Sequence, residues 1–347
     1  MGICVSTASA ETHEVDGGNE NLVRIQDALQ NNRILRLDSL HSQQGNKGPN
    51  QDAAILYQGY GTEDGTFCGV FDGHGKNGHV ISKLVRNRLP SLVLDRKNAL
   101  SALNATVNQD YGDQEDELSD DLVPNKTFRE WKEACLSVFK VIDKELKLHE
   151  NLDCSCSGTT AVVIIKQAED LVIANLGDSR AILGTMTEDG LVAVQLTTDL
   201  KPSLPKEAER IKKNSGRIFS LKNEPHIQRV WLPNDNFPGL AMTRAFGDFK
   251  LKNHGIIAIP EITHHRLSVN DQFLVLATDG VWDVLSIKEV TSIVWLAKSE
   301  KEAARAVVDA AVTAWRSKFP TSKMDDCTVL CLFTGEKSEN AIPTNLI

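Results

Sequence analysis

Five aspartates in this chain stand beside the ends of predicted strands, in segments rich in glycine and small polar residues. They are Asp52 in GPNQDAAI, Asp72 in VFDGHG, Asp178 in ANLGDSRA, Asp279 in LVLATDGVWD and Asp325 in KMDDCTVLCLF. Each one alone is most often a turn or cap residue. As a set they offer the hard oxygen ligands that Mg²⁺ and Mn²⁺ prefer, and these ligand types suit neither a zinc finger nor a haem.

The segment FCGVFDGHGKNGHV, Phe67–Val80, also contains the pattern G-x-G-x-x-G, which is found in dinucleotide-binding turns. Such a turn presents its backbone to a pyrophosphate, so Asp72 would place a carboxylate beside two phosphates. The residues fit a metal-and-phosphate turn better. Asp72 can bridge two cations, the carbonyl of Gly73 can reach a metal, and His74 can donate a proton to a leaving group. A nucleotide-binding oxidoreductase remains an alternative that cofactor titration would test.

Strands and helices must bring these residues to one place. The β-rich runs TTAVVIIK (Thr159–Lys166) and LVIANLGD (Leu171–Asp178) are separated by a short polar link and predict a hairpin. RAILGT, VAVQLT, FLVLATD and TVLCLF are further strand candidates, and their short connections favour antiparallel pairing. The sequence predicts stacked sheets in one domain, covered by helices near residues 79–92, 131–146, 205–213, 287–298 and 304–315.

Composition narrows the class of function. The 347-residue chain carries a formal net charge of -9, which argues against general nucleic-acid binding. An acidic protein can still handle phosphorylated substrates if metal ions supply positive charge. Cys154 and Cys156 could begin a metal site, but no His or Cys pair follows at a suitable spacing. The acidic segment Asp113–Pro124 is expected to be a solvated loop.

The N-terminal residues MGICVS match the pattern M-G-x-x-x-S, in which Gly2 accepts a myristoyl chain. Cys4 is open to palmitoylation, and stable anchoring needs two acyl groups because one myristoyl chain binds membranes only marginally. A chance match is the alternative. The sequence has no cleavable secretory signal and no apolar run of membrane-spanning length. We expect a cytoplasmic protein, held at the inner face of the plasma membrane if it is acylated, with a nuclear pool left open.

Seven motifs follow one another in a fixed order: VFDGHG, SGTTA, GDSRA, DLKP, LAMTRAFGD, ATDGVWD and DDCTV. In this order they resemble the metal-dependent protein phosphatases of type 2C, in the wording of plant-type members, from about Gly45 to Phe333. The resemblance implies an α+β fold, a four-layer α-β-β-α sandwich of two antiparallel sheets flanked by helices. We therefore expect a flexible tail over residues 1–30, a catalytic domain over 31–335 and a C-terminal tail over 336–347.

The resemblance also implies a metal pair, two Mg²⁺ or Mn²⁺ ions in each catalytic site. Asp72 corresponds to the carboxylate that bridges the two ions, and Gly73 to a backbone-carbonyl ligand. Asp279 and Asp325 correspond to the other direct ligands. Asp52 corresponds to a ligand of the metal shell that is often reached through water.

Other positions in the same motifs carry different expectations. Asp178 corresponds to a ligand of a third, weaker ion, and His74 to the proposed general acid. The motif residues 157–160, 243–248 and Asp283 are expected to support the site structurally rather than to take part in catalysis.

Three positions depart from the commonest pattern of the family or raise a question of regulation. Lys47 stands where many members have an arginine that binds the substrate phosphate, and lysine lacks the planar two-pronged contact. Gln51 replaces a glutamate, which removes one negative charge near the second ion. Trp231 precedes the LAMTR motif, where some relatives use a tryptophan to contact a receptor; a structural tryptophan is the alternative.

The resulting hypothesis is hydrolysis of phosphoserine and phosphothreonine in proteins by a water that two ions activate, without a covalent enzyme intermediate. His74 would protonate the leaving oxygen, and Lys47 would help to neutralise the phosphate. The expected partners are phosphorylated protein substrates and kinases, with no nucleic acid, and we expect a monomer. The alternative is a catalytically weak or inactive relative that binds phosphoproteins or kinases as a regulator.

Overall fold

The structure is a computed structural model that describes residues 11–14, 20–26, 38–110 and 126–334. Gly2, Cys4, the whole predicted acidic loop Asp113–Pro124 and the predicted C-terminal tail over 336–347 lie outside these residues.

The first sheet contains nine strands in the described part of the chain, with seven on one path. All pairs are antiparallel except β2 and β4, which run parallel. The path runs β1 (Glu11–Glu14), β2 (Leu22–Gln26), β4 (Asp52–Gln58), β5 (Thr66–His74), β7 (Ala161–Gln167), β8 (Asp170–Leu176) and β15 (Glu261–Arg266), with β6 (Gly158–Thr159) and β14 (Phe246–Gly247) attached beside β5.

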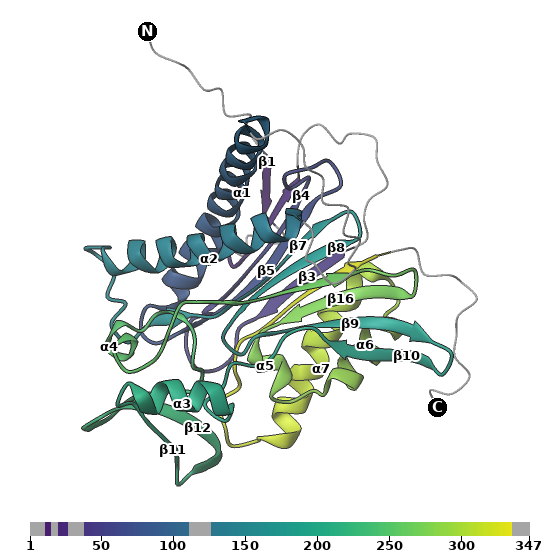
Figure 1. Cartoon of the computed structure of the whole chain (residues 1–347). Helices are drawn as coiled ribbons and strands as arrows, with labels where there is room; N and C mark the ends of the chain where they lie inside the picture. Colours follow the sequence, from purple (N-terminus) through teal and green to yellow (C-terminus); the bar gives the residue numbers. More distant parts are fainter. Residues whose placement is uncertain (1–10, 15–19, 27–37, 111–125, 335–347) are drawn as a thin grey trace.

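The second sheet is antiparallel and packs face to face against the first (Figure 1). Its order is β10 (Gly190–Gln195), β9 (Arg180–Thr187), β16 (Asp271–Ala277), β17 (Cys327–Phe333) and β3 (Asp38–Gln43). The period of two along a strand explains the packing. In β4, Ala54 and Leu56 belong to the core between the sheets, whereas Ala53 and Ile55 face the helices.

Helices cover both outer faces, so the predicted four-layer sandwich is confirmed (Figure 1). The first sheet is covered by α1 (Gly78–Asp110) and α2 (Lys126–Lys147), and the second by α6 (Ile287–Leu296) and α7 (Ala303–Lys318), the last preceded by a short 3-10 helix at Glu300–Glu302. On α2, Trp131, Cys135, Val138, Ile142 and Leu146 recur at helical spacing and are all buried. This apolar stripe drives α2 onto the sheet.

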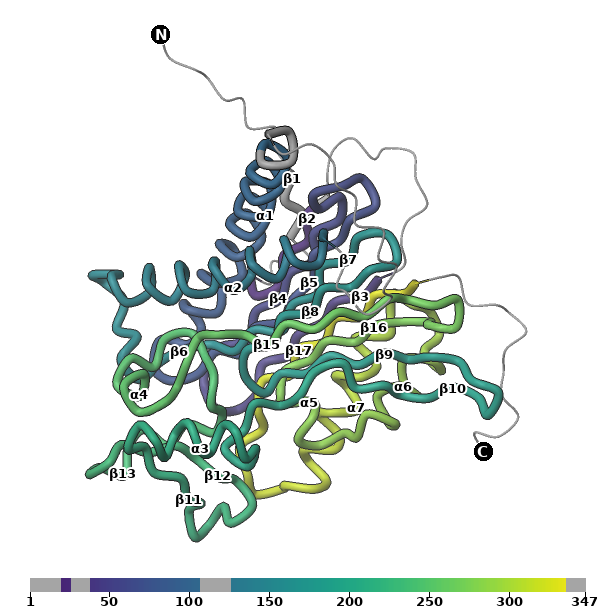
Figure 2. The backbone as a smooth tube through the Cα atoms, in the orientation of Figure 1, coloured from purple at the N-terminus to yellow at the C-terminus, as the bar shows by residue number. Residues whose placement is uncertain are grey.

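A smaller unit, which we call the flap, occupies Pro205–Leu240. It consists of α3 (Pro205–Lys213) and a three-stranded sheet of β11 (Arg217–Leu221), β12 (Glu224–Leu232) and β13 (Asp235–Leu240). Figure 2 shows it beside one end of the two large sheets. Trp231 is buried, stacks on Phe219 at 4.8 Å and donates its indole N–H to the Phe219 carbonyl. The structural interpretation of Trp231 therefore fits, because a buried ring cannot contact a receptor.

The prediction of an irregular tail over residues 1–30 is wrong where the structure describes it. Strands β1 and β2 extend the first sheet inside that range. Leu22 is buried between the two sheets, and the Asn21 carbonyl accepts a hydrogen bond from the amide of Ala54. Leu22, Val23 and Ile25 are the apolar residues of a short strand whose partner, β4, lies some thirty residues away, so local polarity concealed it.

Candidate active site

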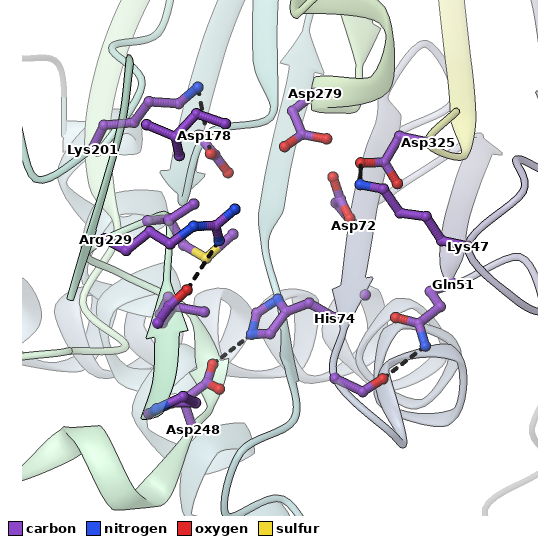
Figure 3. A pocket seen from close by; sticks show the side chains of 18 of the residues that line it. Lys47, Gln51, Asp72, His74, Asp178, Lys201, Arg229, Asp248, Asp279 and Asp325 are labelled. Carbon is purple, nitrogen blue, oxygen red and sulfur yellow. Dashed lines mark hydrogen bonds and ion pairs between the residues drawn. The ribbon is translucent and has the colours of Figure 1, made fainter. Parts of the chain in front are cut away.

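A pocket of about 380 Å³ opens where the ends of both sheets meet the flap. It is lined by six of the metal ligands and catalytic residues predicted from the seven motifs and by Lys47, Gln51, Gly75, Cys156, Lys201, Ile227, Arg229, Pro238, Gly239, Leu240, Ala241, Met242, Asp248 and Asp283. The six are Asp72, Gly73, His74, Asp178, Asp279 and Asp325. Residues more than two hundred positions apart therefore meet in one space (Figure 3).

The segment Phe67–Val80 contributes Asp72, Gly73, His74 and Gly75 to the pocket. Strand β5 continues through Asp72 and Gly73 to His74, and its last residues pair antiparallel with β6. A side chain on Gly73 would meet the carbonyl oxygens of Gln51 and Gly78 at 2.5 Å, so only glycine fits. Because the neighbouring strands β4 and β7 are antiparallel, this is no dinucleotide-binding βαβ turn, and the oxidoreductase interpretation is wrong.

Four carboxylates converge on the pocket: Asp72 at the end of β5, Asp178 between β8 and β9, Asp279 at the start of α5 (Asp279–Trp282), and Asp325 just before β17. Removal from bulk water raises the pKa of Asp72 well above its usual range, and the charge of Asp279 raises it further. Burial and the charge of Asp279 likewise raise the pKa of Asp178 to about 7. The pocket therefore holds several negatively charged carboxylates close together and away from bulk water.

The donor set fits divalent cations with a preference for oxygen. Both oxygens of Asp178 are buried and have no hydrogen-bond partner among the described residues. The Lys201 ammonium lies 3.7 Å from Asp178 and 4.0 Å from Asp283, and the Lys47 ammonium donates to Asp325. Among the described residues, no group of three or more His, Cys, Asp or Glu side chains is already arranged to hold a metal ion. Clustered carboxylates partly compensated by two ammonium groups are the arrangement that a divalent cation would stabilise.

Asp52 lies beneath the pocket rather than on its surface. It is opposite Asp72 in the register of β4 and β5, is almost fully buried, and accepts a hydrogen bond from the Thr278 hydroxyl at 2.8 Å. Burial and the charge of Asp326 raise the pKa of Asp52 well above its usual range. Asp52 is absent from the pocket lining, so the structure groups it with the site without exposing it to a ligand there.

His74 forms a close pair with Asp248, at 2.6 Å between Nε2 and Oδ2. Burial lowers the pKa of His74, but the charge and hydrogen bond of Asp248 outweigh it and raise the pKa above its ordinary value. The other ring nitrogen, Nδ1, has no hydrogen-bond partner among the described residues and faces the pocket (Figure 3). Asp248 was expected to be structural; in the structure it holds the histidine, and only its place in the LAMTRAFGD motif hinted at this.

Two departures from the family pattern find a place here. Lys47 reaches the pocket from the loop before β4 and contacts Asp325. The side-chain amide of Gln51 donates to the Gly75 carbonyl at 2.8 Å. The backbone carbonyl of Gln51 accepts a hydrogen bond from the backbone N–H of Gly73. Gln51 therefore fixes the turn that carries the first carboxylate.

The sequence did not assign two cations of the pocket to the site, and it placed one of the pocket's thiols only in a possible metal site. Lys201 stands in the quoted DLKP motif, whereas Arg229 comes from the flap, where no motif marked it. The thiol is that of Cys156, which lines the pocket while Cys154 is buried. Neither cysteine belongs to a metal cluster in the residues that the structure describes.

The chain is similar to known proteins over most of its length. Residues 29–317 match the family model described as protein phosphatase 2C. The chain is 53% identical over 347 residues to "Probable protein phosphatase 2C 72" of Arabidopsis thaliana, covering 98% of this chain and 99% of that protein. It is 50% identical over 358 residues to "Probable protein phosphatase 2C 12" of Oryza sativa subsp. japonica, covering 96% of this chain and 91% of the relative.

A solved structure gives the same answer for the fold. The crystal structure of serine-threonine phosphatase 2C from Toxoplasma gondii superimposes with a TM-score of 0.70 at 25% identity, covering 85% of this chain and 94% of the other. Sequence motifs, layered fold, carboxylate pocket and relatives thus lead to one assignment: the chain belongs to the protein phosphatase 2C family, the metal-dependent protein serine/threonine phosphatases.

Proposed function

We propose that Asp72, the Gly73 carbonyl, Asp279 and Asp325 hold two Mg²⁺ or Mn²⁺ ions at this pocket. Asp52 would support them from below. A third, weaker ion would lie at Asp178. The observation that carries the proposal is the convergence of these carboxylates on one pocket with pKa values raised by desolvation and mutual repulsion. The fold does not require these carboxylates to repel one another, and a bound cation would relieve the repulsion.

When bound, the ions supply a nucleophilic water at neutral pH and neutralise negative charge on the phosphate. The chain's own residues do the rest. His74, kept protonated by Asp248, presents Nδ1 to the pocket and would donate a proton to the departing seryl or threonyl oxygen. Lys47 is placed to contact a phosphate oxygen as a flexible point charge. No step uses a cysteine.

The test compares leaving groups. A seryl oxygen needs a proton to depart, whereas a nitrophenolate leaves readily without one. His74→Asn should therefore lower kcat on a phosphoserine peptide by about 10²-fold or more and should affect p-nitrophenyl phosphate far less. Asp248→Asn should also lower kcat more on the phosphoserine peptide than on p-nitrophenyl phosphate, but by a smaller factor. Equal losses on both substrates would remove His74 from the role of general acid.

The alternative is an inactive regulator that binds phosphoproteins or kinases. Only Lys47 and Gln51 favour it, whereas every carboxylate and the histidine are present. Turnover of a phosphopeptide with Mn²⁺, abolished by chelator, rejects it. Phosphopeptide binding without any metal-dependent turnover would support it.

Membrane association is a separate proposal, because Gly2 and Cys4 lie outside the described residues. No helix of the described part of the chain is both long and apolar enough to cross a bilayer. We propose acylation at these two residues, with anchoring at the inner face of the plasma membrane, and a monomeric enzyme whose partners include kinases. The intact mass of protein from its native cell shows whether acyl groups are attached.

A further inference from the structure

The catalytic pocket has two chemically different sides. One side carries the carboxylates and ammonium groups described above. The flap and the segment after it supply a second group of lining residues, which we call the apolar wall: Ile227, Pro238, Leu240, Ala241 and Met242. A phosphate bound at the carboxylates would bring its peptide chain into the pocket that this wall also lines.

Ile227 is the exposed member of the wall. Its residue surface is 39% exposed, whereas Leu240 and Met242 are buried in the flap core. The flap core includes Ile211, Val230 and Leu251 but not Ile227. Phe237, next to Pro238 in the chain, is also 46% exposed. The flap therefore folds without burying Ile227, which leaves this side chain available for a ligand.

The wall is held rigidly. Arg229 lies two residues after Ile227 on β12, hence on the same face of the strand. Its guanidinium donates to the Glu224 carboxylate at 2.9 Å and to the Gly239 carbonyl at 3.0 Å, and so ties β12 to β13. A side chain on Gly239 would collide with the Trp231 ring at 2.5 Å, which shows how closely β13 packs there. A preformed apolar surface binds at a low entropic cost.

We propose that the apolar wall binds an apolar side chain that directly flanks the phosphoserine or phosphothreonine of a protein substrate, with Ile227 as the specificity-determining residue. This inference rests on the proposed function, because the occupant is the substrate itself. Its argument is continuity: Ile227 and His74 line the same pocket. An acidic flanking residue fits less well, since the guanidinium of Arg229 already serves Glu224 and Gly239.

The experiment uses phosphoserine peptides that differ only in carrying Leu or Glu on each side of the phosphoserine. Wild type should prefer the Leu peptides at one flanking position. Ile227→Ser should reduce kcat/KM for the preferred Leu peptide about fivefold to tenfold, because apolar contact is lost. The kcat/KM for the matched Glu peptide, which makes no apolar contact with Ile227, should fall less, so the ratio of the two kcat/KM values should drop. Ile227→Lys should shift the preference toward the Glu peptide.

Ile259→Ser is the matched control, since Ile259 is 40% exposed and lies outside the pocket. In this variant the ratio of kcat/KM between the Leu and Glu peptides should equal that of wild type. Equal kcat/KM for Leu and Glu peptides in wild type, or a Glu preference that Arg229→Gln abolishes, would overturn the proposal. Peptide affinities measured with Asp72→Asn separate the two proposals. If the peptides bind with a preference for Leu but wild type does not turn them over, the proposed function is wrong and the apolar wall is supported.

Discussion

Asp178 and Glu207 are both acids with almost no exposed surface, and the fold treats them in opposite ways. Glu207 accepts hydrogen bonds from Arg210 at 2.6 Å and from Arg244 at 2.8 Å. Burial opposes its charge, but these bonds prevail and lower the pKa of Glu207 to about 2. Asp178 has no hydrogen-bond partner among the described residues, and burial raises its pKa to about 7.

The difference separates two uses of a buried charge. Glu207 joins α3 to Arg244, just before the segment that carries Asp248, and its charge is compensated inside the protein. The charges of Asp178 and the other pocket carboxylates are compensated only in part, by Lys47 and Lys201. We infer that a buried carboxylate with hydrogen-bond partners in the protein stabilises the fold, whereas one without such partners is suited to bind a ligand.

Asp72→Asn tests the functional side with the largest expected effect. Loss of the bridging carboxylate should lower kcat for a phosphopeptide by on the order of 10³-fold, since several kcal/mol of charge stabilisation depend on the ions. The thermal midpoint without metal should stay the same or rise, because a repulsive charge is removed. A variant that is inactive only because it is unfolded would show a lowered midpoint and would break the comparison.

Glu207→Gln tests the structural side. We expect a loss of about 3 kcal/mol in the free energy of unfolding at pH 7, because the folded-state pKa of about 2 lies far below the ordinary value of 4.5. A depressed pKa means that the carboxylate stabilises the fold above pH 4.5 and that this contribution disappears as the pH falls through about 2. Urea unfolding at pH 7 and pH 3 measures the effect.

The difference between Glu207→Gln and wild type should therefore shrink at pH 3. The folded fraction of the variant should retain wild-type kcat on p-nitrophenyl phosphate, since Glu207 is not part of the pocket lining. A difference that is constant with pH would mean that shape, and not charge, makes Glu207 important.

Asp178→Asn should move stability in the opposite direction. The raised pKa means that the charged form opposes folding above pH 3.8, so a neutral amide should increase the free energy of unfolding without metal at pH 8. The gain should vanish below pH 4. Unfolding in chelator gives the measurement, and a destabilised Asp178→Asn would show that the carboxylate has a structural partner after all.

Much of the fold followed from local pattern. The helix predicted over 205–213 is observed at the same residues, because a proline start and the helical spacing of Ala208 and Ile211 both lie within it. The hairpin over 159–178 was equally visible. Strand β2 was missed because its pairing partner β4 is distant, and the flap sheet was missed because its burial depends on Trp231 and Phe219 stacking across strands.

Part of the candidate site could likewise be predicted from the sequence, and part could not. Aspartates beside strand ends could be found from the sequence. In an antiparallel pair the end of one strand and the start of its neighbour share an edge, as Asp72 at the end of β5 and Asp52 at the start of β4 do. The bond between His74 and Asp248 could not, since 174 positions separate them and pairing depends on β6 and β14 joining beside β5. The place of Asp52 beneath the pocket depends on the register of β4 against β5, which one residue of slippage would reverse.

Gln51→Glu gives the smallest expected effect and the finest test of the comparison. The new carboxylate adds a charge to a cluster that lacks compensation, so Mn²⁺ should bind about threefold more tightly in calorimetry, while stability in chelator should fall by less than about 1 kcal/mol. Gln195→Glu is the control, because Gln195 also donates its amide to a backbone carbonyl, at 2.7 Å, but far from the pocket. Weaker Mn²⁺ binding in Gln51→Glu alone would mean that the lost hydrogen bond to Gly75 matters more than the added charge, and that even this edge of the pocket is built for structure.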